Sequence, residues 1–180
     1  AFRADLCGGQ KTGWFYDQRP NRAWIADIAA GARVLDLYSY AGGFAVRALA
    51  AGAAYALAVD RAETPLALAR AAAAGAEVES RLETRQGDAF DVLAELTATK
   101  QRFEIAVCDP PPFARAKKDV PAAIRGYRKL ARGAAGVVAA EGFLAIASCS
   151  HHVGTDALVQ ASFQGLRDAG RSGRLVFTGG

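Results

Sequence analysis

The chain has 180 residues, of which 52% are hydrophobic, and it carries a formal net charge of +4. This length and apolar content predict one ordinary globular domain with a single core. No apolar run approaches the roughly eighteen residues of a membrane span, the opening residues lack the apolar stretch of a secretory signal, and three scattered cysteines cannot form a disulfide framework. We therefore expect a soluble, cytoplasmic protein that contacts no membrane.

The first half of the chain alternates strand-like apolar runs with alanine-rich segments of helical period. This pattern predicts strands over residues 33–38, 54–59 and 81–86. It predicts helices over residues 44–51, 65–74 and 90–96.

The second half continues the alternation. A strand over residues 103–108 ends at Asp109, and Pro121 opens a helix that runs to about residue 139, where Glu141 and Gly142 end it. A fully buried strand over residues 143–148 and a helix over residues 155–169 follow. Residues 175–178 read as the start of a sixth strand without its partner, so we expect the chain to be cut at both ends.

Strands that alternate with helices favour an α/β fold of the Rossmann-like kind, a mostly parallel sheet with helices on both faces. In such folds ligands bind at the carboxyl ends of the strands. Residues just after each predicted strand are therefore the ones to inspect for chemistry.

Small residues dominate the turn after the first strand, from Asp36 to Phe44. The turn lacks the GxGxxG pattern that holds a pyrophosphate, which favours a nucleoside-type ligand without phosphates. Asp60 ends the second strand, where an acid can accept both ribose hydroxyls. Asp88 follows the third strand and could hold an adenine amino group. The structural alternatives stay open: a tight turn at the glycines, and a helix N-cap at Asp88.

Three prolines follow Asp109 and are expected to hold the backbone extended at the ligand edge, where a planar base could dock. The last predicted strand ends in a thiol, Cys149, flanked by serines and followed by His151 and His152. A thiolate favoured by nearby groups is a nucleophile, although a cysteine at a strand end is commonly only a small buried side chain. No metal-binding CxxC pair or ligand cluster is present in the sequence, so no metal is expected.

Basic residues bracket these loops, which favours an anionic partner such as the phosphates of a nucleic acid. A solvated helix face is the alternative for those after residue 120. They are Lys11, Arg19, Arg22, Arg115, Lys117, Lys118, Arg125, Arg128 and Lys129.

Four segments, in order GQKTGWFYDQR, VLDLYSYAGGFAVRALAAGA, DPPPFARAKKDVPAAIRGY and SCSHHV, together resemble the bacterial 23S ribosomal RNA cytosine-5 methyltransferases. The resemblance covers nearly the whole chain. It implies a class I methyltransferase fold, S-adenosyl-L-methionine as cofactor, and a ribosomal RNA substrate whose cytidine is single-stranded or flipped out of its helix.

The resemblance also implies roles for individual residues. Cys149 would be the nucleophile that adds to cytosine C6, and Asp109 would hold the base. The cofactor would contact Lys11, Thr12, Asp36, Tyr38, Ser39, Tyr40, Gly42, Gly43, Phe44, Asp60, Arg61, Asp88, Ala89 and Asp109. The substrate would contact Gln18, Arg19, Pro110, Pro111, Phe113, Lys117, Arg125, Tyr127, Ser148 and His151. Cys108, next to Asp109, is expected to point into the sheet because strand residues alternate.

The chain departs from that family by starting too late to contain its N-terminal RNA-binding module and by stopping before its last strands. We expect residues 1–30 to form a lead-in segment over the active site and residues 31–180 to form the methyltransferase domain. Two other functions stay open: methylation of an amino group without covalent catalysis, and a non-catalytic Rossmann-like domain that binds nucleotide or RNA. The oligomeric state is also open, a homodimer included.

Overall fold

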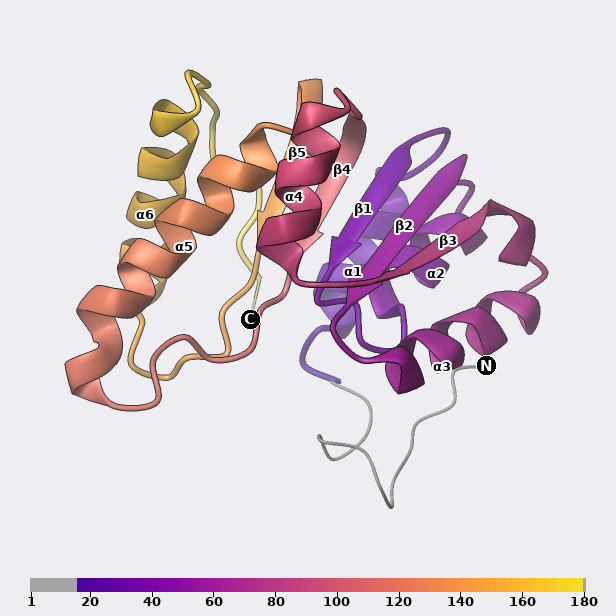
Figure 1. Ribbon diagram of the computed structural model, residues 1–180, viewed down its shortest axis with the longest axis horizontal. Coiled ribbons are helices and arrows are strands. Elements are labelled where there is room, and N and C mark those ends of the chain that lie inside the picture. The colour runs from indigo at the N-terminus through magenta and orange to yellow at the C-terminus, as the bar shows by residue number, and fades with distance from the viewer. Residues whose placement is uncertain (1–15, 180) are drawn as a thin grey trace. The chain divides into compact units, whose positions relative to one another are not determined.

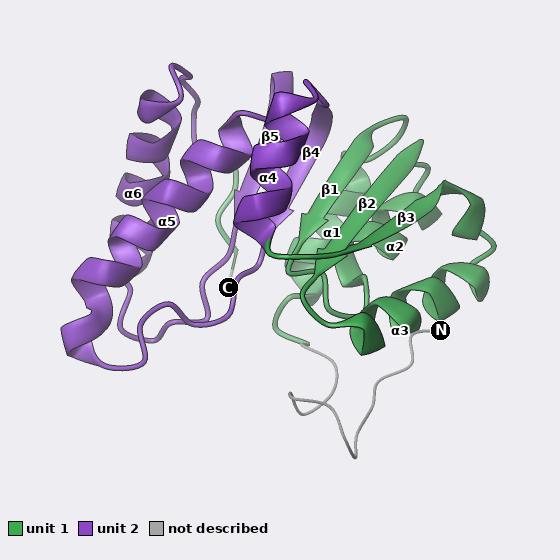
Figure 2. Cartoon of the chain, viewed as in Figure 1, with its two compact units in different colours: residues 1–88, 177–180 green, residues 89–176 purple. Residues whose placement is uncertain are grey.

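The computed structural model describes residues 16–179. These residues form two compact units, which Figure 2 shows in green and purple. Of the described residues, unit 1 contains 16–88 and 177–179, and unit 2 contains 89–176. Each unit holds its own parallel strands and helices.

Unit 1 begins with a helix and continues as alternating strands and helices (Figure 1). Strand β1 pairs in parallel with β2, and β2 pairs in parallel with β3, with Asp36 opposite Ala58 and Asp60 opposite Gln86. The elements are α1 (Arg19–Asp27), β1 (Arg33–Leu37), α2 (Gly43–Ala50), β2 (Tyr55–Asp60), α3 (Glu63–Ala74), the short 3₁₀ helix η1 (Glu79–Arg81) and β3 (Leu82–Gln86).

Small alanine side chains allow the helices and strands of unit 1 to pack closely. Helix α2 contacts all three strands and α3, and its Ala45, Ala48 and Leu49 are fully buried. The central residues of β2, Ala56 to Val59, are also fully buried, as expected for a parallel strand covered on both faces. The apolar runs that predicted these strands are therefore the core of this unit.

Unit 2 is built around two parallel strands and a long helix (Figure 1). Helix α5 contacts α4, α6 and both strands, and Pro121 lies in its first turn, where the missing N–H costs nothing. The elements are α4 (Ala89–Ala98), β4 (Phe103–Cys108), the 3₁₀ helix η2 (Lys117–Asp119), α5 (Val120–Ala135), β5 (Val138–Ile146) and α6 (Thr155–Asp168).

The predicted boundary between the fifth strand and the helix before it is wrong. Helix α5 ends at Ala135, and β5 begins at Val138, so Glu141 and Gly142 lie inside the strand. They form an irregularity in which the register jumps from Phe103↔Val138 to Ile105↔Phe143, with Glu141 at a φ of 59°. A Cβ on Gly142 would lie 2.7 Å from the Glu104 carbonyl oxygen of β4. Glycine is needed here because the two backbones approach closely.

Other expectations also fail. Strand β5 is mostly half-buried, not fully buried. Residues 175–178 form no strand, and the ring of Phe177 instead stacks on Trp24 of α1 at 4.9 Å between centroids. Helix α1 was not predicted. The alternation of parallel strands and helices nevertheless confirms the predicted Rossmann-like α/β fold. Within residues 16–179, no helix is both long and apolar enough to cross a membrane.

Candidate active site

The loop after β1, residues 38–42 and hereafter the β1 loop, has an unusual backbone. Tyr38, Tyr40 and Gly42 all have positive φ angles, of 63°, 48° and 71°. Non-glycine residues rarely adopt this conformation, and where they do the surrounding structure holds them there. Here the Ser39 N–H donates to the Val59 carbonyl at 2.9 Å. The β1 loop is therefore folded against the end of β2.

Gly42 is required for packing inside the protein. A Cβ at this position would lie 2.8 Å from the Cβ of Ala69 in α3. Because the residue also has a positive φ, any side chain would be strained there. Gly42 is thus required both by its positive φ and by the approach of the β1 loop to α3.

Asp36, on β1, is fully buried, and its Oδ2 accepts a hydrogen bond from the Ala45 N–H in the first turn of α2 at 3.0 Å. A carboxylate at this end of a helix is favoured by the unpaired N–H groups there. Gly43 begins α2, and the ring of Phe44 is buried. These residues therefore hold the β1 loop between strand and helix.

Asp60 connects two turns at the carboxyl ends of the strands. Its Oδ2 accepts from the Tyr40 N–H at 2.9 Å, and its Oδ1 accepts from the Ala62 N–H at 3.0 Å. A carboxylate oxygen can accept more than one hydrogen bond, so this half-buried group keeps the capacity to accept two hydroxyls. Nearby, the Ser39 hydroxyl is buried without a hydrogen-bond partner among the described residues.

Asp88, after β3, forms an ion pair with the exposed Arg61. The Arg61 Nε donates to Asp88 Oδ2 at 3.0 Å, with a second contact from a terminal guanidinium nitrogen. The Gln86 side chain donates to the Arg61 carbonyl at 3.0 Å. The next residue, Ala89, is buried. Arg61 therefore already contacts the carboxylate that was expected to hold the adenine amino group.

In unit 2, Asp109 follows β4 and opens the proline loop, residues 109–116. Asp109 is half-buried, Pro110 is buried and Pro111 is exposed. Phe113 does not extend toward solvent as a substrate contact would: its ring packs on Tyr127 at 4.7 Å between centroids, within a buried cluster. Phe113 is thus an apolar anchor of the proline loop.

The thiol turn, residues 148–150, follows β5. Its Cys149 is exposed, and the Cys149 Sγ lies 3.7 Å from the Pro110 carbonyl oxygen, within reach of a weak S–H donor. The Ala147 N–H donates to the Cys108 carbonyl at 2.9 Å, which extends the β4–β5 pairing up to the turn. Cys108 itself is fully buried, as the alternation of strand residues predicted.

Tyr127, which was expected to contact substrate, lies inside unit 2. Its side chain is fully buried in α5, and its hydroxyl lies 2.7 Å from Ser148 Oγ and 3.3 Å from Ser150 Oγ. Ser148, also expected at the substrate, is half-buried in this network. Sequence reasoning named Ser150 only as a neighbour of Cys149 and gave it no role; its place next to a candidate nucleophile was the available signal.

Similarity to known proteins identifies the family of this chain. The family model described as "S-adenosylmethionine-dependent methyltransferase" matches residues 1–170. The chain belongs to this family. S-Adenosylmethionine is accordingly its cofactor. The Asp60 carboxylate accepts two backbone N–H groups and has lone pairs left for further donors, which fits the ribose hydroxyls of such a ligand.

Relatives of this methyltransferase have names of one kind. The chain is 36% identical over 178 residues to the "Ribosomal RNA large subunit methyltransferase" of Deinococcus radiodurans, covering 98% of this chain and 44% of that protein. It is 34% identical over 173 residues to "Ribosomal RNA large subunit methyltransferase I" of Tolumonas auensis, covering 96% and 44%. The chain therefore spans less than half the length of these relatives.

Solved structures agree on the fold. The crystal structure of SMU.776, a methyltransferase complexed with SAH, matches with a TM-score of 0.82 and 27% identity, over 92% of this chain and 44% of that one. A SAM-dependent methyltransferase from Agrobacterium tumefaciens matches with a TM-score of 0.78 and 17% identity, over 92% and 55%. The second likeness, at this identity, concerns the fold alone.

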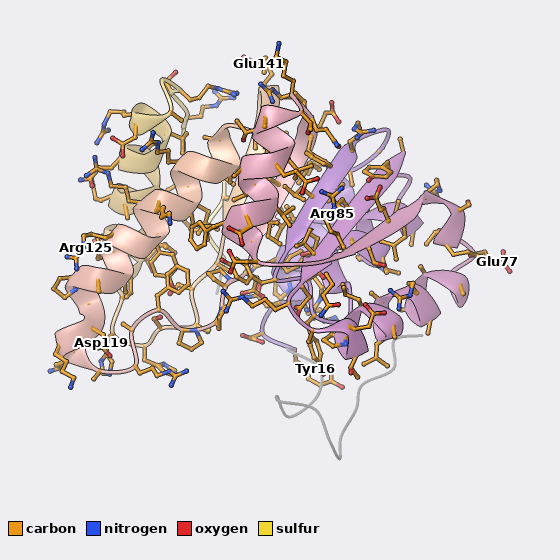
Figure 3. All side chains as sticks on the ribbon, viewed as in Figure 1. Tyr16, Glu77, Arg85, Asp119, Arg125 and Glu141 are labelled. Atoms are coloured by element: carbon orange, nitrogen blue, oxygen red, sulfur yellow. The ribbon has the colours of Figure 1, made fainter. Side chains whose placement is uncertain are left out.

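The basic residues of the methyltransferase separate into free and engaged groups. Arg115, Lys117, Lys118 and Arg125 are exposed in the proline loop, η2 and α5; Figure 3 labels Arg125 on α5. Arg128 instead forms a two-pronged ion pair with Asp168, at 2.5 and 2.8 Å, and Lys129 lies over the ring of Phe90. This hydrogen-bonded pairing raises the pKa of Arg128 and lowers that of Asp168.

The remaining residues predicted for the site differ in their exposure. Arg19 is exposed at the start of α1, after Gln18, whose side chain accepts from Asn21 at 2.9 Å. Arg22, expected on a basic rim, is buried. His151 is exposed. Lys11 and Thr12 lie outside the described residues. No group of three or more metal-ligating side chains was found in residues 16–179.

Proposed function

We propose that this chain is the catalytic domain of an enzyme that methylates C5 of a cytidine in large-subunit ribosomal RNA. The observation that carries the proposal is the exposed Cys149 thiol beside the Pro110 carbonyl, next in sequence to Asp109. The names of the relatives support ribosomal RNA as substrate.

The chemistry requires such a thiol because C5 of cytosine is a poor nucleophile. When bound, S-adenosylmethionine supplies an electrophilic methyl group. Addition of the Cys149 thiolate to C6 would form an S–C6 bond and move the C5–C6 π electrons onto C5. C5 could then take the methyl group as the sulfonium S–CH3 bond breaks, with the neutral thioether as leaving group. Loss of the C5 proton to a base and cleavage of the S–C6 bond restore the ring and the thiolate. Asp109 would hold the N3 and amino edge, where charge develops.

The exposed cations support the RNA part of the proposal. Lys117, Lys118 and Arg125 lie in η2 and α5, the elements that follow the proline loop, and their side chains are exposed. Lysine and arginine side chains attract phosphates through the release of condensed counterions. The target base has to be single-stranded or flipped out, because a stacked base cannot be reached by a nucleophile.

The test uses full-length protein with unmodified ribosomal RNA and labelled S-adenosylmethionine, followed by nucleoside analysis. Wild type is expected to yield 5-methylcytidine, and Cys149→Ser to yield none while still binding the cofactor. Cys108→Ala is the matched control, because that cysteine is fully buried.

Two results would contradict the proposal. Continued methylation by Cys149→Ser, or a product methylated on an amino group, would favour amine methylation with a structural Cys149. RNA binding without S-adenosylmethionine binding would favour the non-catalytic alternative.

A further inference from the structure

Three buried or half-buried hydroxyls meet beneath the thiol turn. The Tyr127 hydroxyl lies 2.7 Å from Ser148 Oγ and 3.3 Å from Ser150 Oγ, so one phenol contacts both residues that flank Cys149. Tyr127 is fully buried, and Ser150 is 4% exposed. Cys149, between the two serines, is exposed. In the thiol turn the Ser150 side chain is therefore buried, while the Cys149 side chain is exposed to solvent.

The hydrogen bonds of this network can all be satisfied together. Ser148 Oγ accepts from the Ser150 N–H at 3.2 Å, and Ser150 Oγ accepts from the Ala114 N–H at 3.3 Å. The Tyr127 hydroxyl can donate to one serine and accept from the other, since a phenol both donates and accepts. Buried polar groups that are fully paired specify one arrangement, whereas an unpaired one is costly.

The same network reaches the proline loop. Ala114 belongs to that loop, and Phe113 beside it packs on the Tyr127 ring. A Cβ on Gly126, the neighbour of Tyr127, would come within 2.9 Å of the Phe113 ring, so this part of α5 is shaped to the loop. Tyr127 thus contacts both the thiol turn and the proline loop. These are the two segments in which the Cys149 Sγ and the Pro110 carbonyl oxygen lie 3.7 Å apart.

From these contacts we infer that Tyr127 is a positioning residue, whose hydroxyl holds the thiol turn so that Cys149 keeps one orientation against the proline loop. The inference rests on the proposed function for its catalytic consequence, because orientation matters to the rate only if Cys149 attacks the base. Its structural part is independent of that function: removal of the Tyr127 hydroxyl, which contacts both flanking serines, should loosen the exposed thiol between them.

The experiment compares Tyr127→Phe with wild type in full-length protein. Phenylalanine keeps the ring against Phe113 and removes only the hydroxyl. Tyr55→Phe is the matched control, because its hydroxyl donates to Glu83 at 2.6 Å in unit 1, far in sequence from the thiol turn. Alkylation of Cys149 by iodoacetamide is followed by mass spectrometry of the tryptic peptide 133–167, in which Cys149 is the sole cysteine.

Tyr127→Phe is expected to be alkylated at Cys149 at least about threefold faster than wild type, because the turn no longer holds the thiol at the Pro110 carbonyl. Tyr55→Phe should match wild type. In the methylation assay, Tyr127→Phe should lower kcat about tenfold with little change in KM for RNA, as expected when the reacting group loses its orientation. In a Ser148→Ala background the same substitution should add almost nothing, because both act through one network.

An unchanged alkylation rate in Tyr127→Phe, or effects of Tyr127→Phe and Ser148→Ala that multiply independently, would overturn the inference. The failure of the proposed function has a different outcome: Cys149→Ser would continue to methylate, whatever the alkylation rates are. The two ideas therefore fail separately.

Discussion

The β1 loop of unit 1 and the thiol turn of unit 2 both lie at the carboxyl ends of parallel strands, yet they are held in different ways. The β1 loop is fixed by backbone geometry and carboxylates: three positive φ angles, and backbone N–H groups bonded to Asp36 and Asp60. The thiol turn is fixed by side-chain hydroxyls from Tyr127, Ser148 and Ser150. Charge-assisted bonds are the stronger kind.

This difference suits the two proposed tasks. A loop that binds the same cofactor in every cycle benefits from a rigid backbone. Neutral hydroxyls hold the thiol turn in one arrangement without adding a charge beside Cys149. Substitutions in the β1 loop should therefore affect cofactor affinity and stability, and substitutions under the thiol turn should affect rate.

The largest expected effect is that of Asp60→Ala on S-adenosylmethionine binding. This change removes the acceptor of the Tyr40 and Ala62 N–H groups as well as the proposed ribose acceptor. Hydrogen bonds to a charged group contribute about 1.5–3 kcal/mol, so Kd should rise about ten- to hundredfold in calorimetric titration. Asp119→Ala, in unit 2, is the control and should leave Kd unchanged.

Gly42→Ala should destabilise the β1 loop. The new methyl group would lie 2.8 Å from Ala69 Cβ, at a residue with a φ of 71°. Overpacking of this kind costs about 1–3 kcal/mol in the free energy of unfolding, measured by urea denaturation. Gly31→Ala is the control, because Gly31 has a φ of 72° but nothing within 4 Å of its added Cβ. Equal losses for the two variants would show that backbone strain alone is responsible.

The cations of unit 2 should differ in their effect on RNA binding. Lys117→Ala and Arg125→Ala each remove an exposed charge, so each should reduce the slope of log Kd against log salt by about 0.7–0.9. Arg128→Ala should leave the slope unchanged, because Asp168 already occupies that guanidinium. If all three variants reduce the salt slope by a similar amount, Arg128 binds RNA phosphates despite its ion pair with Asp168.

The smallest effects concern pH, and the two units should respond at opposite extremes. Burial and a hydrogen bond to Glu83 raise the pKa of Tyr55. A raised folded-state pKa gives stability that is present below about pH 10 and lost as the pH rises further. The lowered pKa of Asp168 gives stability that is present above about pH 4 and lost on acidification.

Thermal denaturation of two variants tests this assignment. The difference in Tm between wild type and Tyr55→Phe should shrink from pH 9 to pH 11, and that for Asp168→Asn should shrink from pH 7 to pH 3. If the difference in Tm stays constant across either pH range, the corresponding interaction does not contribute to the pH dependence of stability.

Sequence alone predicted the elements whose apolar runs are buried on both faces. The strands β1, β2 and β4 were placed within one or two residues, and so were Asp60 at the end of β2 and Asp109 after β4, because hydrophobic period and strand ends are local properties. The side on which a helical residue packs is not local. Tyr127 and Phe113 read equally well as surface aromatics near a ligand, and only their mutual contact shows that they form a core.

Only the tertiary structure decided where a strand becomes irregular and which side chains contact residues distant in sequence. Glu141 and Gly142 read as the end of a helix, yet they lie in the irregular part of β5, where Gly142 lets the strand approach the Glu104 carbonyl. Arg22 and Arg128 look like surface cations in sequence, and one is buried while the other is paired with Asp168, 40 residues away. Composition and period determine which segments form strands and helices, whereas partners distant in sequence determine which side chains remain available for chemistry.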